Sequence, residues 1–323
     1  METIFVVYPN PDSYADALLG DLHSNNNVYF VKRPYNRFMR DFQYYYTSLK
    51  ANALFRLPFQ SLWYKSYTPK CVSNISYIFL FLQGNSLAYD HKYLEYLKKN
   101  YKNSIICFNW LNIASTVSEK YITFVNSTYD YVFTFDTNDH LKYGWILHDA
   151  FYSDVSRWVF PDTKESDVFF VGEAKERLDI LHQIFDIFTN AGYKCDFYIT
   201  GVEKHKQIKQ GIKYNTPLPY YDVLSHCAKT KVILEIVQKG QVGLTLRTCE
   251  SISLGKKLLT NNNGILQSHF NGSNIFKFDV VTEIQPKIII HSKIDFDDLN
   301  KRKCLLSPSL LMQEIKEITT HEE

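Results

Sequence analysis

The sequence predicts an α/β protein built from two consecutive domains, each organised around a parallel sheet. Three observations lead to this prediction. Short apolar segments alternate with amphipathic helical patterns in both halves of the chain, and this alternation lapses between residues 149 and 165 before it starts again. A chain of 323 residues with 45% hydrophobic content is also long enough for two cores. We therefore expect one domain at residues 1–155 and a second at 156–323.

The first half contains five short apolar runs bounded by turn residues, which predict strands at 4–8, 28–31, 77–82, 104–108 and 131–135. Helical spacing follows the first run, where Tyr14, Leu18 and Leu22 share a face, and recurs at 90–99. Because strands alternate with helices, we expect the strands to be parallel and any ligand to lie beyond their carboxyl ends.

The second half repeats this pattern, with strands expected at 167–171, 195–200, 232–237, 257–260, 275–278 and 287–291. Leu178, Leu181 and Phe185 predict a helix after the first of these strands. Pro308 precedes a last helix at 309–318, which we expect to pack back across the junction of the domains. The two domains would then face each other across a cleft.

Composition excludes several classes of protein. The net charge is only +2, so no strong positive field favours a nucleic acid partner. Six cysteines are scattered without the spacing of a metal site, and we expect neither a metal nor another cofactor. No apolar run has the length of a signal peptide core or a membrane span, so the expected location is cytoplasmic.

The strongest chemical signal lies between residues 231 and 263. A buried strand is followed by a glycine-containing loop and a short helix at 246–254, which Thr245 can cap and Gly255 can end. The first turn of such a helix offers free backbone N–H groups and the positive end of a helix dipole. The segment therefore predicts an anion site of the kind that holds a diphosphate.

Arg247 and Glu250 share one face of this helix. A guanidinium matches phosphate oxygens, and a carboxylate can accept hydrogen bonds from a ribose diol, so the pair describes a nucleotide diphosphate. An intrahelical ion pair on a solvated face is the alternative, and the spacing does not separate the two.

The stretch from Thr245 to Thr260, with Gln241 to Leu244 before it, resembles the donor-binding segment of GT-B glycosyltransferases, which have two Rossmann-like domains. The nearest resemblance is to bacterial enzymes that build capsule, exopolysaccharide or lipopolysaccharide. It implies transfer of a sugar from a nucleotide diphospho-sugar, most simply a UDP-sugar, to a glycan or polyprenyl-linked acceptor, with Glu250 on the ribose. Many retaining members have a further glutamate where this chain has Val242, and Gln241 could replace it as a partner of sugar hydroxyls.

The same resemblance implies a second donor element in the turn from Gly172 to Arg177, where Arg177 or Lys175 would contact the diphosphate. An ordinary helix start with surface charges is the alternative. A sugar-nucleotide epimerase and a catalytically silent glycan-binding subunit remain alternatives for the whole chain.

An inverting transferase also needs a base in the first domain to take the proton of the acceptor hydroxyl. Asp12 and Asp136 each follow a predicted strand, which makes them candidates, although an aspartate in this position often caps a helix.

Two further segments carry weaker signals. Residues 33–67 combine an apolar helical stripe with cations, which suits either a helix at the inner face of the cell membrane or a helix packed on the sheet. Residues 295–298, Asp-Phe-Asp-Asp, have the form of a metal-binding DxD motif, but their position predicts a helix-capping acidic turn.

Overall fold

The computed structural model describes residues 2–9, 14–31, 63–161, 164–238 and 243–320. The chain forms two compact units. The first comprises Met1–Ala15, Gly20–Asp149 and Leu311–Glu323, and the second comprises Asp16–Leu19 and Ala150–Leu310. The chain thus changes unit at residue 150, so the boundary expected at residue 155 lies inside the second unit.

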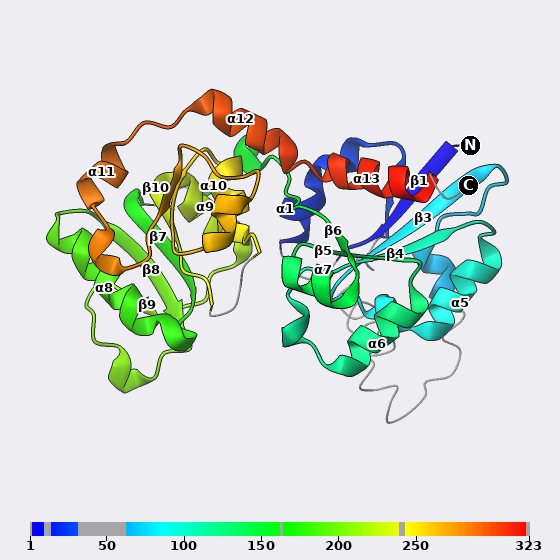
Figure 1. Cartoon of the computed structure of the whole chain (residues 1–323), viewed down its shortest axis with the longest axis horizontal. Helices are drawn as coiled ribbons and strands as arrows, with labels where there is room; N and C mark the ends of the chain where they lie inside the picture. The colour runs from blue at the N-terminus through cyan, green and yellow to red at the C-terminus, as the bar shows by residue number, and fades with distance from the viewer. Residues whose placement is uncertain (1, 10–13, 32–62, 162–163, 239–242, 321–323) are drawn as a thin grey trace. The chain divides into compact units, whose positions relative to one another are not determined.

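The first unit is built on a parallel sheet of six strands in the order β2-β1-β3-β4-β5-β6 (Figure 1). The strands are β1 Glu2–Tyr8, β2 Val28–Phe30, β3 Ile75–Leu82, β4 Ile105–Asn109, β5 Tyr131–Thr134 and β6 Ile146–Leu147. The five strands predicted in this half are confirmed. The two-residue strand β6 had no prediction, since so short a segment carries no periodic pattern.

The described residues of this part of the chain form the helices α1 Ala15–Leu19, α5 His91–Asn100, α6 Glu119–Thr128 and α7 Thr137–Tyr143. Short 3-10 turns lie between them: η1 Gly20–Ser24, η2 Lys65–Tyr67, η3 Ser86–Tyr89 and η4 Ala114–Thr116. Asp90 caps α5 by accepting a hydrogen bond from the backbone N–H of Tyr93, which fixes the start of this helix where the sequence predicted it.

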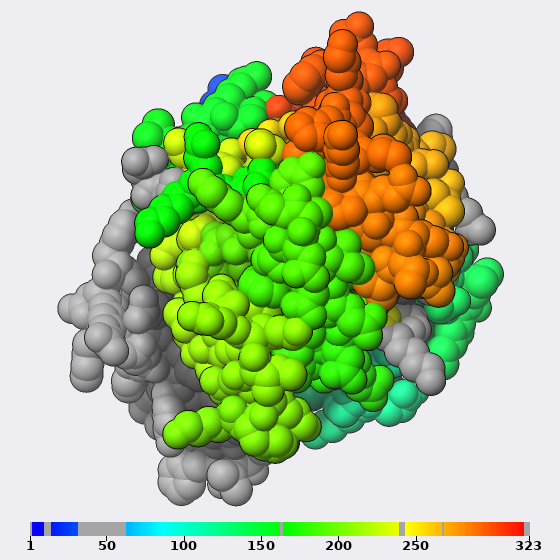
Figure 2. Space-filling view, turned by 90° about the vertical axis from the view of Figure 1, so that its left-hand side faces the viewer, coloured from blue at the N-terminus to red at the C-terminus, as the bar shows by residue number. Residues whose placement is uncertain are grey.

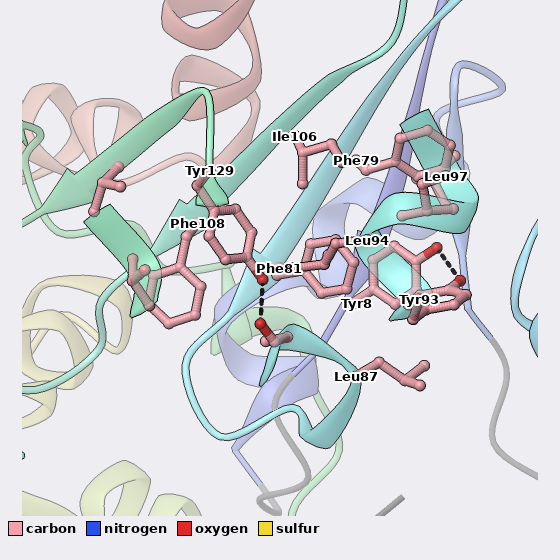
Figure 3. Close-up of a cluster of buried hydrophobic side chains, with 14 of the residues drawn as sticks. Tyr8, Phe79, Phe81, Leu87, Tyr93, Leu94, Leu97, Ile106, Phe108 and Tyr129 are labelled. Carbon is pink, nitrogen blue, oxygen red and sulfur yellow. Dashed lines mark hydrogen bonds between the residues drawn. The ribbon is translucent and has the colours of Figure 1, made fainter. Parts of the chain in front are cut away.

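An aromatic core fills one face of the first sheet (Figure 3). Its rings come from alternate positions of neighbouring strands, as with Tyr8 of β1 and Phe81 of β3, whose centroids are 3.9 Å apart. Three buried tyrosines of this core have hydrogen-bonded hydroxyls: Tyr8 and Tyr93 bond to each other at 2.7 Å, and Tyr129 donates to the carbonyl of Ala88 at 2.6 Å. Much of the high aromatic content is therefore used in packing.

The second unit repeats the architecture with a six-stranded parallel sheet in the order β12-β11-β10-β7-β8-β9. The strands are β7 Ser166–Glu173, β8 Cys195–Thr200, β9 Lys213–Tyr214, β10 Thr230–Glu235, β11 Lys257–Thr260 and β12 Ile275–Lys277.

Helices cover both faces of this sheet (Figure 1). The helices among the described residues of this unit are α8 Leu178–Asn190, α9 Tyr220–Lys229, α10 Leu246–Ser253, α11 Pro286–His291 and α12 Phe296–Leu305, with 3-10 turns η5 Val155–Arg157, η6 Lys175–Arg177, η7 Lys204–Lys206, η8 Asn263–Gln267 and η9 Val281–Glu283. Isoleucines of α11 share a core with α8, and Figure 2 shows the orange segment that includes α11 beside the green segment that includes α8.

The strand predicted at 287–291 is wrong, because these residues form helix α11. Three consecutive isoleucines suggested a strand, since branched side chains are common in sheets. Pro286, however, occupies the first turn of the helix, where its missing N–H and fixed φ are favourable.

The last helix, α13 Pro308–Thr320, begins in the second unit, and its residues from Leu311 onward belong to the first. Glu314 of α13 pairs with His148, which directly follows β6, at 2.9 Å. The helix predicted at 309–318 is thus confirmed, while its packing across the junction of the domains stays a prediction.

Candidate functional site

The strand order of the second sheet places a topological switch point between β7 and β10. From β7 the chain adds β8 and β9 on one side, then crosses over and adds β10, β11 and β12 on the other. Ligands of open parallel sheets bind beyond the carboxyl ends of the strands at such a point, because the loops there leave in opposite directions. The residues that follow β7 and β10 are therefore the first place to look for a site.

Arg177 connects the ends of these two strands. Its guanidinium donates hydrogen bonds to the carbonyl of Glu173, the last residue of β7, and to the carbonyl of Ile236, directly after β10. A side chain at Gly172 would come within 3.3 Å of the Phe170 ring and 3.7 Å of the guanidinium, so glycine leaves room for this arrangement. Two residues predicted to contact the donor, Gly172 and Arg177, thus lie together at the switch point.

Two cations, Arg177 and Lys175, lie at this edge together with the carboxylate of Glu173. Burial lowers the pKa of Arg177, but a guanidinium keeps its charge at neutral pH. Its buried Nε–H has no hydrogen-bond partner among the described residues. Lys175 lies close by, with its ammonium 2.9 Å from the Gln238 amide oxygen. Its side chain is 44% exposed, so the alternative of a surface charge at a helix start describes Lys175 better than Arg177.

Helix α10 follows β10 and begins as the sequence predicted. The hydroxyl oxygen of Thr245 accepts a hydrogen bond from the backbone N–H of Arg247 at 3.0 Å, and Gly255 ends the helix with a left-handed φ of 66°. The cap predicted at Thr245 is therefore confirmed. Gln241 and Val242, in the loop before the helix, lie outside the described residues.

The ion pair between Arg247 and Glu250 is formed, but it is not on a solvated face. The Glu250 side chain is 0% exposed and that of Arg247 is 18% exposed. Burial raises the pKa of the Glu250 carboxyl, and the charge of Arg247 offsets only part of this rise. Arg247 and Glu250 therefore form the intrahelical ion pair of the alternative interpretation. That interpretation is wrong in placing the pair on a solvated face, because the pair is buried.

Other side chains complete the shell around Glu250. The hydroxyl of Tyr220 donates to one carboxylate oxygen at 2.8 Å, and the thiol of Cys227 lies 3.5 Å from the other. Tyr152 in turn shares a hydrogen bond of 2.8 Å with Tyr220. Because Glu250 is fully buried among these partners, a ribose hydroxyl that bound it would have to take the place of one of them.

Glu235, at the end of β10, is a buried carboxylate that sequence reasoning missed. It is 2% exposed and accepts hydrogen bonds from three hydroxyls, those of Thr245, Thr248 and Thr260. The available signal was a charged residue inside an otherwise apolar strand, which by itself does not identify its partners.

In the first unit, Asp136 caps α7. One carboxylate oxygen accepts the backbone N–H groups of Asn138 at 2.9 Å and Asp139 at 3.0 Å. The other oxygen is buried and has no hydrogen-bond partner among the described residues. The capping alternative is confirmed for Asp136, while its role as a base stays a prediction. Asp12, the second candidate base, lies outside the described residues.

The acidic turn at 295–298 is a helix cap, as predicted. Asp295 accepts the backbone N–H groups of Asp297 at 3.0 Å and Asp298 at 3.2 Å, and Asp298 pairs with Arg302 at 2.7 Å. Across the residues that the structure describes, no three His, Cys, Asp or Glu side chains come together as metal ligands would.

Most of the basic and aromatic segment 33–67 lies outside the described residues, which resume at Trp63. In the part of the chain that is described, no helix has both the length and the hydropathy needed to span a membrane.

The whole chain is similar in fold to solved glycosyltransferase structures. An alpha-glucosyltransferase in complex with UDP-glucose and DNA containing an abasic site matches with a TM-score of 0.54 and 12% identity over 99% of each chain. An alpha-glucosyltransferase in complex with UDP and a 13-mer DNA containing a central A:G mismatch matches with a TM-score of 0.53 and 13% identity, over 99% of this chain and 100% of that one. No protein-family model matches the chain, and no curated protein matches it in sequence. The likeness confirms the predicted GT-B fold class.

Proposed function

We propose that this protein is a glycosyltransferase that binds a UDP-sugar at the carboxyl edge of its second sheet. The observation that supports this most directly is Arg177, fixed between the ends of β7 and β10 at the switch point. A guanidinium near a capped helix N-terminus is a favourable setting for a diphosphate. The fold likeness to proteins solved with UDP or UDP-glucose supports a uridine donor.

The proposed roles on the donor side follow from these positions. Arg177 and the first turn of α10 hold the diphosphate, with Thr245 serving as the cap of that turn. Glu250 accepts the ribose hydroxyls in place of the Tyr220 hydroxyl that it binds now. Gln241 is proposed to contact the hydroxyls of the donor sugar.

In an inverting reaction, the acceptor hydroxyl attacks the anomeric carbon and forms the new C–O bond. The bond between that carbon and the β-phosphate oxygen breaks, and UDP leaves with the electron pair. Asp136, or Asp12, takes the acceptor proton. Arg177 stabilises the negative charge that develops on the leaving diphosphate. We propose that this chemistry needs no metal.

The proposed acceptor is a glycan or a lipid-linked glycan of bacterial surface polysaccharide synthesis, with residues 33–67 in contact with the cytoplasmic face of the membrane. One observation favours a second acceptor class. The two glucosyltransferase structures described above also hold DNA, which makes transfer to DNA the second candidate.

Calorimetric titration with UDP tests the donor site. We expect Arg177→Gln to weaken UDP binding by about tenfold or more, since a phosphate contact of a charged group is lost. Arg157→Gln is the control, because the Arg157 side chain is 86% exposed and remote in sequence from the switch point. Equal UDP affinity in wild type and Arg177→Gln would overturn the assignment of the site.

A transfer assay with a panel of UDP-sugars then tests the reaction. The acceptors are a lipid-linked saccharide and duplex DNA with and without a hydroxymethylated base, since ordinary bases lack an alcohol. Conversion of one UDP-sugar into another without any acceptor would instead indicate an epimerase. Donor binding without turnover on any acceptor would favour the silent glycan-binding subunit.

A further inference from the structure

The carboxylate of Glu235 lies at the end of β10, directly before the loop that leads to the proposed diphosphate site. Its hydrogen-bond donors are neutral hydroxyls. Thr248 donates to Oε1 at 2.9 Å, Thr245 donates to the same oxygen, and Thr260 donates to Oε2. A carboxylate that is 2% exposed needs such donors to offset the loss of water.

Two of these hydroxyls also accept hydrogen bonds from the backbone. A threonine hydroxyl has a single proton, so donation to Glu235 turns its lone pairs toward other donors. The Thr245 oxygen accepts the N–H of Arg247 at 3.0 Å, and the Thr260 oxygen accepts the N–H of Asn262 at 2.9 Å. Glu235 therefore sets the orientation of one group at the start of α10 and one directly after β11.

Asn262 extends this network back toward the start of α10. It is 0% exposed, and its amide nitrogen donates to the carbonyl of Gly243 at 3.2 Å. Its amide oxygen accepts the N–H of Gly264 at 3.0 Å. Both ends of the segment 243–247 are consequently tied to Glu235, one through Thr260 and Asn262 and the other through Thr245.

We propose that Glu235 is a positioning residue for the donor diphosphate. It holds the segment 243–247 in the conformation in which the first turn of α10 presents its N–H groups, without touching the donor itself. This inference rests on the proposed function, because it assumes that the diphosphate binds at this turn. The proposal makes a specific prediction: binding of the phosphates of the nucleotide should depend on Glu235, whereas binding of its uridine part should not.

The test compares UDP with uridine, which lacks the phosphates. UDP binding is measured by calorimetry and uridine binding by ligand-observed NMR. We expect Glu235→Gln to weaken UDP binding by about tenfold and to change uridine binding by less than about twofold. An amide can no longer accept hydrogen bonds on both sides, so one threonine hydroxyl must turn away from its backbone partner.

Two threonine variants form a matched pair. Thr245→Val removes a hydroxyl that links Glu235 to the turn, and it should weaken UDP binding by about tenfold as Glu235→Gln does. Thr245→Ser keeps the hydroxyl and should restore wild-type binding.

The outcomes separate this inference from the proposed function. If wild-type protein does not bind UDP, the proposed donor site fails. If wild type binds UDP and both Glu235→Gln and Thr245→Val bind it equally well, the positioning role is overturned. It is also overturned if Thr245→Ser loses as much UDP affinity as Thr245→Val, or if uridine binding falls in parallel. Thermal melting checks that Glu235→Gln is folded. If it is not folded, the UDP affinities of Thr245→Val and Thr245→Ser decide whether the positioning role holds.

Discussion

Both sheets are parallel and six-stranded, but their carboxyl edges differ in how their polar groups are used. At the second sheet, Arg177 donates to two carbonyls and Glu235 accepts from three hydroxyls. At the first sheet, three buried side-chain atoms have no hydrogen-bond partner among the described residues: Asn109 Nδ2, Trp110 Nε1 and Asp136 Oδ2. Buried polar atoms usually have partners. At the second edge, the described residues leave Arg177 Nε without a partner. The first edge thus keeps more unused hydrogen-bonding capacity that a ligand could meet.

The largest effect should come from breaking the ion pair near the second edge. Arg247→Ala leaves the carboxylate of Glu250 buried without its cation, and we expect the free energy of unfolding to fall by about 3 kcal/mol. Urea denaturation measures this, and hydrogen exchange of α10 peptides localises it.

The control for that variant is Arg157→Ala. Arg157 pairs with Asp154 at the same spacing of three residues, 3.4 Å apart, but its side chain is 86% exposed. Exposed pairs contribute little, so no measurable change is expected. A similar loss in the free energy of unfolding for Arg247→Ala and Arg157→Ala would mean that burial does not make the first ion pair more important than the second.

The first edge is tested by Asp136→Asn. The amide oxygen can still cap α7, so stability should be unchanged, whereas the rate of sugar transfer should fall by about a hundredfold if the free oxygen takes the acceptor proton. Asp295→Asn is the matched control, because Asp295 caps α12 through the same two backbone positions. A transfer rate that Asp136→Asn leaves intact would remove Asp136 as the base.

A smaller effect concerns the pH dependence of stability. Burial raises the folded-state pKa of Glu250 above its usual value of 4.5. Between pH 4.5 and the raised pKa, Glu250 keeps its proton in the folded protein but has lost it in the unfolded chain. The free energy of unfolding therefore falls as the pH rises through this window. Glu250→Gln should remove this contribution. Thermal melting of both proteins from about pH 4 to about pH 8 measures it, and identical slopes would contradict it.

The smallest expected effect is that of metal removal. Asp295, Asp297 and Asp298 form a helix cap and an ion pair with Arg302, which accounts for the DxD-like sequence. We therefore expect EDTA to change the transfer rate by less than about twofold, although metal ions assist phosphoryl leaving groups in many enzymes. Restoration of a lost rate by Mg²⁺ or Mn²⁺ would show that the proposed reaction depends on metal.

Local patterns predicted most of the architecture. The strand at 257–260 and the start and end of α10 could be placed because apolar runs and capping residues act over a few neighbouring positions. The helix at 286–291 was predicted as a strand because branched side chains outweighed the proline signal.

The environment of the candidate site residues was harder to predict. The pairing of Arg247 with Glu250 follows from helical spacing. The burial of that pair depends on Tyr220 and Tyr152, which are distant in sequence. The partners of Glu235 likewise come from two elements that meet only in the folded unit. Contacts of this kind are set by topology and cannot be read from one segment.

The return of α13 to the first unit also bears on how the protein is made. Residues 311–320 are synthesised after the whole of the second unit, although Leu311 and Ile315 are fully buried parts of the fold. Domains generally fold in the order in which they leave the ribosome, the N-terminal one first. Here the first unit cannot finish folding until its last helix has been synthesised, so a nascent chain can complete the folding of its second unit before that of its first.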